Sequence, residues 1–226
     1  HRVDRRQRQM CIRDSIKKVD KASNGKIGYI YIPDMGPEGL NEFSRYFYPQ
    51  LNKEGLIIDD RANGGGNVSP MILERLSREP YRLTMRRGSA RIGTVPDAVQ
   101  VGPKVCLINK YSASDGDLFP WGFRALGLGK LIGTRTWGGI VGISGSLPYM
   151  DGTDIRVPFF TSFDPKTGSW IIENHGVDPD ILIDNDPVKE WNGEDQQLDR
   201  AIQEVMKELQ DRKPLPGVPT PRDFSK

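Results

Sequence analysis

Uninterrupted apolar runs divide the chain into segments typical of a buried sheet. The run at residues 55–60 shows no alternation of polar and apolar side chains, and residues 104–109 repeat this pattern. A strand covered on both faces has no polar face, so its apolar residues follow one another. Residues 26–33, rich in β-branched and aromatic side chains and closed by a proline, and residues 129–137 predict two further strands.

Between these runs, apolar residues recur at helical spacing. We predict helices over residues 38–51, 68–77, 118–128 and 195–210, the last with Leu198, Ile202, Val205, Met206 and Leu209 on one face. The alternation of strand and helix predicts an α/β fold with a mostly parallel core sheet and a C-terminal helix. The exception is a hairpin expected over residues 146–160, turning at Asp151-Gly152.

The two ends of the chain differ from this pattern. Residues 1–15 show no periodicity, and "MCIRDS" is the translation of a common sequencing-library adapter, so we expect an artefact that leaves the true N-terminal part of the protein missing. The alternative is a basic arm that binds nucleic acid. We expect a catalytic or binding core over residues 16–211. Residues 212–226 form a proline-rich tail that we expect to be disordered.

Charge and composition exclude several classes of function. Residues 1–15 hold five of the 32 basic and two of the 30 acidic side chains, so the remainder is nearly neutral and predicts no nucleic-acid partner. No run of about 18 apolar residues is present, which argues against a membrane span. Apart from Cys11, the one cysteine is Cys106 in an apolar run, and the histidines are His1 and His175. We therefore expect no disulfide and no multi-histidine metal site.

Three short stretches could carry chemistry. In "YSASDGD", Ser112 or Ser114 could cap the following helix, or Ser114 could be a nucleophile at a helix N-terminus, where free amides stabilise an oxyanion. Asp115 and Asp117 suit the helix dipole in either case. In "DDRANGGGN", the glycines could form a flexible turn or offer backbone amides to a ligand, and Gly66 is our candidate oxyanion donor.

The third stretch, "IIENHGVDPDI", holds Glu173 and His175. Taken alone, Glu173 reads as a solvated turn residue. His175 could be a general base, although a histidine in a turn is more often only packed or exposed.

Together, "GYIYIPDMG", "GLIIDDRANGGGNVS", "YSASDGD", "LGLGKLIGTRTWGGIVGI" and "ENHGVDPDI" resemble the catalytic core of the tricorn-like serine peptidases, in the clan of C-terminal processing peptidases. The resemblance implies a ClpP/crotonase-like spiral of ββα units and an ATP-independent serine endopeptidase that needs no cofactor. It implies that Ser114 is the nucleophile, that the amides of Gly66 and Asp115 form the oxyanion hole, and that Glu173 completes a Ser–His–Ser–Glu tetrad. It also implies peptide or unfolded polypeptide substrates and a homo-oligomer, for which a hexamer is one option. We expect a cytoplasmic location, with a periplasmic or secreted one left open because the N-terminal part is missing.

Some family features have no counterpart in this sequence. The tetrad histidine and its serine are expected upstream, before a PDZ domain, so we expect the chain alone to be nearly inactive. Related peptidases use a lysine base where this chain has Arg135, which cannot accept the serine proton. His175 replaces a tyrosine of the family pattern. Leu83 lies near the position of an aspartate that favours basic P1 residues, so we expect a hydrophobic or mixed P1 pocket.

Two other functions stay open. A crotonase-like acyl-CoA enzyme would share the fold and a two-amide oxyanion hole but would need no nucleophile. A catalytically inactive relative that binds peptides or supports assembly would equally explain the unmatched histidine.

Overall fold

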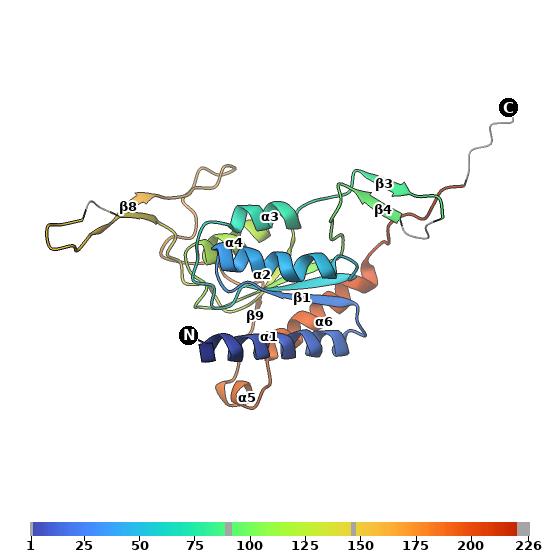
Figure 1. The fold of residues 1–226 in the computed structure, drawn as a ribbon, viewed down its shortest axis with the longest axis horizontal. Coiled ribbons are helices and arrows are strands. Elements are labelled where there is room, and N and C mark those ends of the chain that lie inside the picture. Colours follow the sequence, from blue (N-terminus) through green and yellow to red (C-terminus); the bar gives the residue numbers. More distant parts are fainter. Residues whose placement is uncertain (1, 89–91, 146–147, 221–226) are drawn as a thin grey trace.

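A five-stranded parallel sheet forms the centre of the molecule in the computed structural model (Figure 1). The structure describes residues 2–88, 92–145 and 148–220, with side chains from Cys11 onward. The strands follow the order β1-β2-β5-β6-β9, and each neighbouring pair is parallel. They are β1 (Ile27–Tyr31), β2 (Gly55–Asp59), β5 (Lys104–Ile108), β6 (Gly129–Gly133) and β9 (Ile181–Leu182).

Helices cover both faces of this sheet (Figure 1). One face packs against α2 (Pro37–Phe47), α3 (Ser69–Leu76) and α4 (Asp115–Ala125), and a short 3₁₀ helix, η1 (Tyr48–Gln50), follows α2. The other face packs against α1 (Arg2–Ala22) and α6 (Gln196–Asp211). Every residue of β2 and β5 is buried, as their unalternating apolar runs predict. The predicted α/β class, the mostly parallel sheet and the C-terminal helix are confirmed, whereas the ClpP/crotonase-like spiral stays a prediction.

The N-terminal segment departs from the expected organisation. Residues 1–15 were left out of the predicted fold, yet α1 is one continuous helix from Arg2. Ile12 and Val19 are buried against the sheet and Ile16 packs beside them, so one apolar stripe crosses the expected boundary. The adapter origin of residues 1–15 stays a prediction.

Two antiparallel hairpins extend from opposite ends of the molecule (Figure 1). One pairs β7 (Gly142–Gly145) with β8 (Arg156–Phe160) and turns near Gly152, whose amide donates to the Tyr149 carbonyl. Its first strand lies earlier in the chain than predicted, and residues 146–147 are outside the described residues. The second hairpin, β3 (Arg82–Met85) with β4 (Ile92–Val95), is absent from the predicted elements.

Smaller differences concern element ends. Helix α4 begins at Asp115 instead of Leu118, and β6 ends at Gly133 instead of Trp137. The two-residue strand β9 and the short α5 (Pro187–Trp191) were not predicted. In the tail, residues 212–220 form no helix or strand, and residues 221–226 lie outside the described residues. Among the helices that the structure describes, none is both long and apolar enough to span a bilayer.

Candidate active site

Two loops meet where β2 and β5 end. The chain leaves β2 after Asp59 into the glycine-rich loop, and it leaves β5 after Ile108 into the turn before α4. Adjacent parallel strands release their loops at the same edge of the sheet, so the two predicted motifs come together. The amide of Ala113 donates to the Asn63 carbonyl at 2.8 Å, and the Ser112 hydroxyl donates to the Asp60 carbonyl at 2.8 Å. The two loops therefore form one rigid unit.

Ser114 occupies the N-cap position of α4 without acting as a cap. Its side chain makes no capping hydrogen bond, and its backbone has φ 57° and ψ −119°. This conformation is unfavourable for a residue with a Cβ, so the neighbouring contacts must hold it. Ser112 does not cap the helix either, because its hydroxyl is committed to Asp60. The capping interpretation is therefore wrong for both hydroxyls, and Ser114 stays exposed at a helix N-terminus.

The glycine-rich loop lies directly against the Ser114 turn. A Cβ added at Gly65 would come within 2.7 Å of the Ser114 Cβ, and one added at Gly66 would come within 2.0 Å of the Met35 carbonyl oxygen. Only glycine allows this approach. Within the part of the chain that the structure describes, the amides of Gly66 and Asp115 donate to no acceptor. Both amides are thus available to a ligand.

The Asp115 side chain points to α3 and not to Ser114. Its carboxylate accepts the Ser69 hydroxyl at 2.5 Å and the Ser69 amide at 2.9 Å. The residue is 5% exposed. Asp115 therefore satisfies an amide at the start of α3, while its own amide stays at the open end of α4.

Glu173 is not a solvated turn residue, contrary to the interpretation of that stretch alone. Its Oε2 accepts hydrogen bonds from the amides of Ile140 and Val141, at 2.6 and 2.9 Å. The flanking residues Ile172 and Asn174 have φ values of 21° and 59°, so the turn around Glu173 is sharply bent. Glu173 therefore fixes the segment that leads into β7.

Asp117 holds the preceding part of the same segment, a role that the sequence did not reveal. Its carboxylate accepts the amide of Gly138 at 2.8 Å and that of Gly139 at 3.4 Å, and the side chain is fully buried. Burial raises the pKa of Asp117, and hydrogen bonds from Thr136, Gly138, Gly139 and Ser114 oppose that rise. Two carboxylates thus share four consecutive amides, those of residues 138–141.

His175 and Arg135 share one partner, the carboxylate of Asp178. The His175 Nε2 lies 2.8 Å from Oδ2 of Asp178, whose Oδ1 accepts Arg135 Nε at 2.6 Å. The hydrogen bond from His175 lowers the pKa of Asp178 most, and the hydrogen bond from Arg135 lowers it further. All three side chains are at least half exposed. Among the described residues, neither His175 nor Arg135 forms a hydrogen bond or ion pair with Ser114.

Asp60 lies buried beneath the two loops. Its Oδ1 accepts the Asn63 amide group at 2.9 Å, while Oδ2 has no partner among the residues that the structure describes. Burial raises the pKa of Asp60 well above its usual value, and the nearby Asp59 carboxylate raises it further. The carboxyl group therefore stays protonated to higher pH than an exposed aspartate does.

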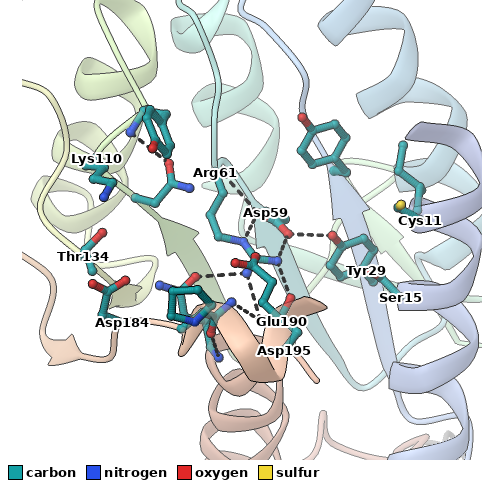
Figure 2. Close-up of a pocket in the computed structure, with 17 residues that line it drawn as sticks. Cys11, Ser15, Tyr29, Asp59, Arg61, Lys110, Thr134, Asp184, Glu190 and Asp195 are labelled. Carbon is teal, nitrogen blue, oxygen red and sulfur yellow. Dashed lines mark hydrogen bonds and ion pairs between the residues drawn. The ribbon is translucent and has the colours of Figure 1, made fainter. Parts of the chain in front are cut away.

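A cavity of about 680 Å³ opens at the same edge of the sheet but on the side of α1 and α6 (Figure 2). Arg61 lies in it between Asp59 and Asp195, and the Tyr29 hydroxyl donates to Asp59 at 2.6 Å. These charged groups are paired with one another, and the lining does not include Ser114. This cavity is therefore separate from the candidate site.

Two other hollows bear on the predicted substrate contacts. An open groove of about 590 Å³ beside Glu173 is lined by apolar side chains that include Phe159, Phe160 and Trp170. Leu83, expected near the P1 pocket, lines a different cavity with residues 216–219 of the tail. Ser114 does not line that cavity, and the place of Leu83 in a P1 pocket stays a prediction.

Known proteins resemble this chain in sequence and in structure. Residues 26–183 match Peptidase family S41. The tricorn protease of Thermoplasma volcanium is 45% identical over 197 residues, which cover 86% of this chain and 19% of that protein. Tricorn protease homolog 1 of Streptomyces coelicolor is 38% identical over 184 residues, covering 81% of this chain and 17% of the relative.

A crystal structure of the tricorn protease superposes with a TM-score of 0.82 at 42% identity, covering 88% of this chain and 19% of that one. The chain thus spans about a fifth of the length of the curated relatives it matches.

Proposed function

Because this chain belongs to peptidase family S41, we propose that it is the part of a serine peptidase that carries the nucleophile, Ser114. The observation that carries this proposal is the geometry of the Ser114 turn. An exposed hydroxyl stands at the N-terminus of α4, beside a loop whose close approach requires glycine at positions 65 and 66, with two amides left without acceptors. A helix N-terminus with free amides stabilises the negative charge that develops during acyl transfer.

In the proposed reaction, the Ser114 hydroxyl gives its proton to a histidine and attacks the carbonyl carbon of a peptide bond. The amides of Gly66 and Asp115 donate hydrogen bonds to the resulting oxyanion. The histidine then protonates the leaving amine, the C–N bond breaks, and an acyl-enzyme forms on Ser114. Water hydrolyses this ester and restores the hydroxyl. Each amide is worth about 3 kcal/mol of transition-state stabilisation.

Glu173 is the candidate for the carboxylate of the tetrad. It is partly exposed and already accepts two backbone amides through Oε2. An ionised carboxylate accepts through both oxygens, so Oε1 is available to the serine that orients the histidine. That serine and that histidine are expected in a segment upstream of a PDZ domain, outside this chain.

The general base is the part of the mechanism that this chain does not supply. His175 is the one histidine among the described residues, and its ring is bound to Asp178. Arg135 offers only N–H donors, so it cannot accept the serine proton. We therefore propose that the full-length protein hydrolyses peptides and that residues 1–226 alone do so at a small fraction of that rate.

A serine-directed fluorophosphonate tests the proposal on the full-length protein. We expect one covalent adduct on Ser114, loss of peptide hydrolysis with the same time course, and no adduct in Ser114→Ala. Unlabelled Ser114 in a protein that still hydrolyses peptides would show that another residue is the nucleophile. Unlabelled Ser114 in an inactive protein that binds peptides would favour the peptide-binding alternative, and turnover of an acyl-CoA would favour the crotonase-like one.

Substrate, assembly and compartment follow only from the resemblance. We propose unfolded polypeptide or peptide substrates with hydrophobic or mixed P1 residues, a homo-oligomer and a cytoplasmic location. The exposed apolar side chains of the β7–β8 hairpin, among them Ile143, Phe159 and Phe160, support self-association. Sedimentation of the full-length protein tests the oligomer, and a peptide panel varied at P1 tests the specificity. A strong preference for Arg or Lys at P1 would contradict the expected pocket.

A further inference from the structure

The Ser114 turn and the Glu173 turn are joined through the segment of residues 138–141, which the buried carboxylate of Asp117 holds from one side. Asp117 reaches the amides of Gly138 and Gly139, and Glu173 reaches the next two amides along the chain. The segment of residues 138–141 is therefore clamped from both sides. Any movement of α4 relative to the Glu173 turn must break one of these hydrogen bonds.

The contact with Ser114 is an incomplete capping box. In a complete box, the N-cap side chain binds the N3 amide while the N3 carboxylate binds the N-cap amide. Asp117 stands at N3, and the Ser114 amide helps to lower the pKa of its carboxyl group. In return, the Asp117 amide donates to the Ser114 carbonyl oxygen at 2.8 Å and not to the hydroxyl. The arrangement secures the Ser114 backbone and leaves the hydroxyl free.

The surroundings of Asp117 allow little adjustment. The residue is completely buried, and Gly138 has φ 89° with the Gly176 amide nitrogen only 2.5 Å from the position of an added Cβ. The Trp137 amide donates to the Ser112 carbonyl at 2.9 Å, which ties the same segment to the turn before Ser114. Close packing of this kind transmits a displacement of the carboxylate directly to its partners.

We propose that Asp117 is a positioning residue that fixes the position of the Ser114 hydroxyl relative to Glu173. It has this role in addition to being a buried residue of α4. The inference rests on the proposed function, because it concerns how the nucleophile is aligned. Asp117 touches no substrate atom and acts through the Ser114 backbone and the segment of residues 138–141. Loss of alignment slows acylation without weakening substrate binding, and a misplacement of about 1 Å costs about 100-fold in rate.

The test uses the full-length protein and Asp117→Asn, which keeps the shape of the side chain and one acceptor oxygen but loses the charge. We expect kcat and the rate of phosphonate acylation to fall by about 100-fold while KM changes by less than about threefold. Asp199→Asn is the matched control, because Asp199 also lies in the first turn of a helix, α6, on the other side of the sheet. This control should leave kcat unchanged.

A second variant guards against a folding defect. Thr136→Val removes a hydroxyl that lowers the pKa of Asp117 and that accepts the Val177 amide at 2.8 Å, and it leaves both carboxylates in place. We expect a smaller loss, of about threefold to tenfold in acylation rate, with KM again unchanged. Suppose that the phosphonate labels Ser114 in the wild-type protein and that folded Asp117→Asn is acylated at the wild-type rate. The inference about Asp117 is then overturned, while the proposed function survives. If neither Thr136→Val nor a folded Asp117 variant separates kcat from KM, Asp117 is only structural. If the wild-type protein is not labelled, the proposed function itself fails.

Discussion

Arg61 binds the carboxylate of Asp195, 134 residues further along the chain, through two nitrogens at 3.0 and 2.8 Å. Asp195 also caps α6 by accepting the amide of Leu198 at 3.0 Å. Arg61 in turn donates to both oxygens of Asp59, at the end of β2. The start of the glycine-rich loop, which holds the candidate oxyanion donor Gly66, is therefore fixed to the start of α6.

We expect Arg61→Met to destabilise the protein strongly. The substitution leaves Asp59, which is 2% exposed, and Asp195 without their cation. Breaking a buried ion pair by removing one partner lowers the free energy of unfolding by about 3–5 kcal/mol. Urea unfolding followed by circular dichroism measures the change. Lys26→Met is the control, because Lys26 and Glu54 form an exposed pair at 3.9 Å, for which about 0–1 kcal/mol is expected. A loss below about 1 kcal/mol in Arg61→Met would contradict the role given to this contact.

Two neighbouring glycines provide a sharp test of the Ser114 turn. We expect Gly65→Ala to reduce the rate of phosphonate labelling of Ser114 in the full-length protein by about tenfold or more, since the new methyl group would meet the Ser114 Cβ and Gly65 has φ 94°. A Cβ at Gly64 meets no atom within 4 Å, so Gly64→Ala should label at the wild-type rate. Equal rates for the two variants would show that the close approach has no effect on the nucleophile.

The raised pKa of Asp60 predicts that the stability of the protein depends on pH. Because burial and Asp59 raise its pKa, the folded state keeps a proton that the unfolded state releases above about pH 4. The contribution of this group to stability therefore falls as the pH rises from about 4 towards the folded-state pKa. Asparagine cannot ionise, so we expect Asp60→Asn to match the wild type near pH 4 and to be more stable near pH 7. Urea midpoints over this range measure the difference, and a difference that does not grow with pH would refute the buried proton.

The stability of the fold should depend more on the side-chain oxygens of Glu173 than on its charge. Glu173→Gln keeps an acceptor for the amides of Ile140 and Val141, whereas Glu173→Ala leaves both without a partner. We expect Glu173→Ala to lower the free energy of unfolding by about 1–3 kcal/mol and Glu173→Gln by less. Peptide hydrolysis by the full-length protein should fall in both variants, because the proposed tetrad needs the carboxylate. Full activity in Glu173→Gln would remove Glu173 from the tetrad.

The sequence predicted the elements that bury continuous apolar runs. Strands β2 and β5 follow directly from such runs, and the adjacency of their loops follows from the parallel sheet. The resemblance to tricorn-like peptidases is confirmed by the family match and by the tricorn structure. The roles carried over to Ser114, Gly66, Asp115 and Glu173 stay predictions, although the structure brings the first three together.

Contacts between distant residues were not predictable. Asp115 and Asp117 differ by two positions and both suited the helix dipole, yet one binds Ser69 and the other binds Gly138 and Gly139. Which backbone amide a carboxylate reaches depends on packing that no local pattern records. The β3–β4 hairpin was missed for a similar reason, since its strands are short, half-buried or exposed, and bury no continuous run.

The pairing of α1 with α6 on one face of the sheet has a consequence for biosynthesis. Ile57, Val105, Leu107 and Ile132 lie under these helices, and α6 leaves the ribosome only after every strand has been translated. During elongation the part of this face formed by β2, β5 and β6, over which α6 packs, stays uncovered. Exposed apolar surface of this kind is what chaperones recognise. Ribosome-bound chains that stop before Gln196 should therefore be held by chaperones, and release should coincide with the docking of the last helix.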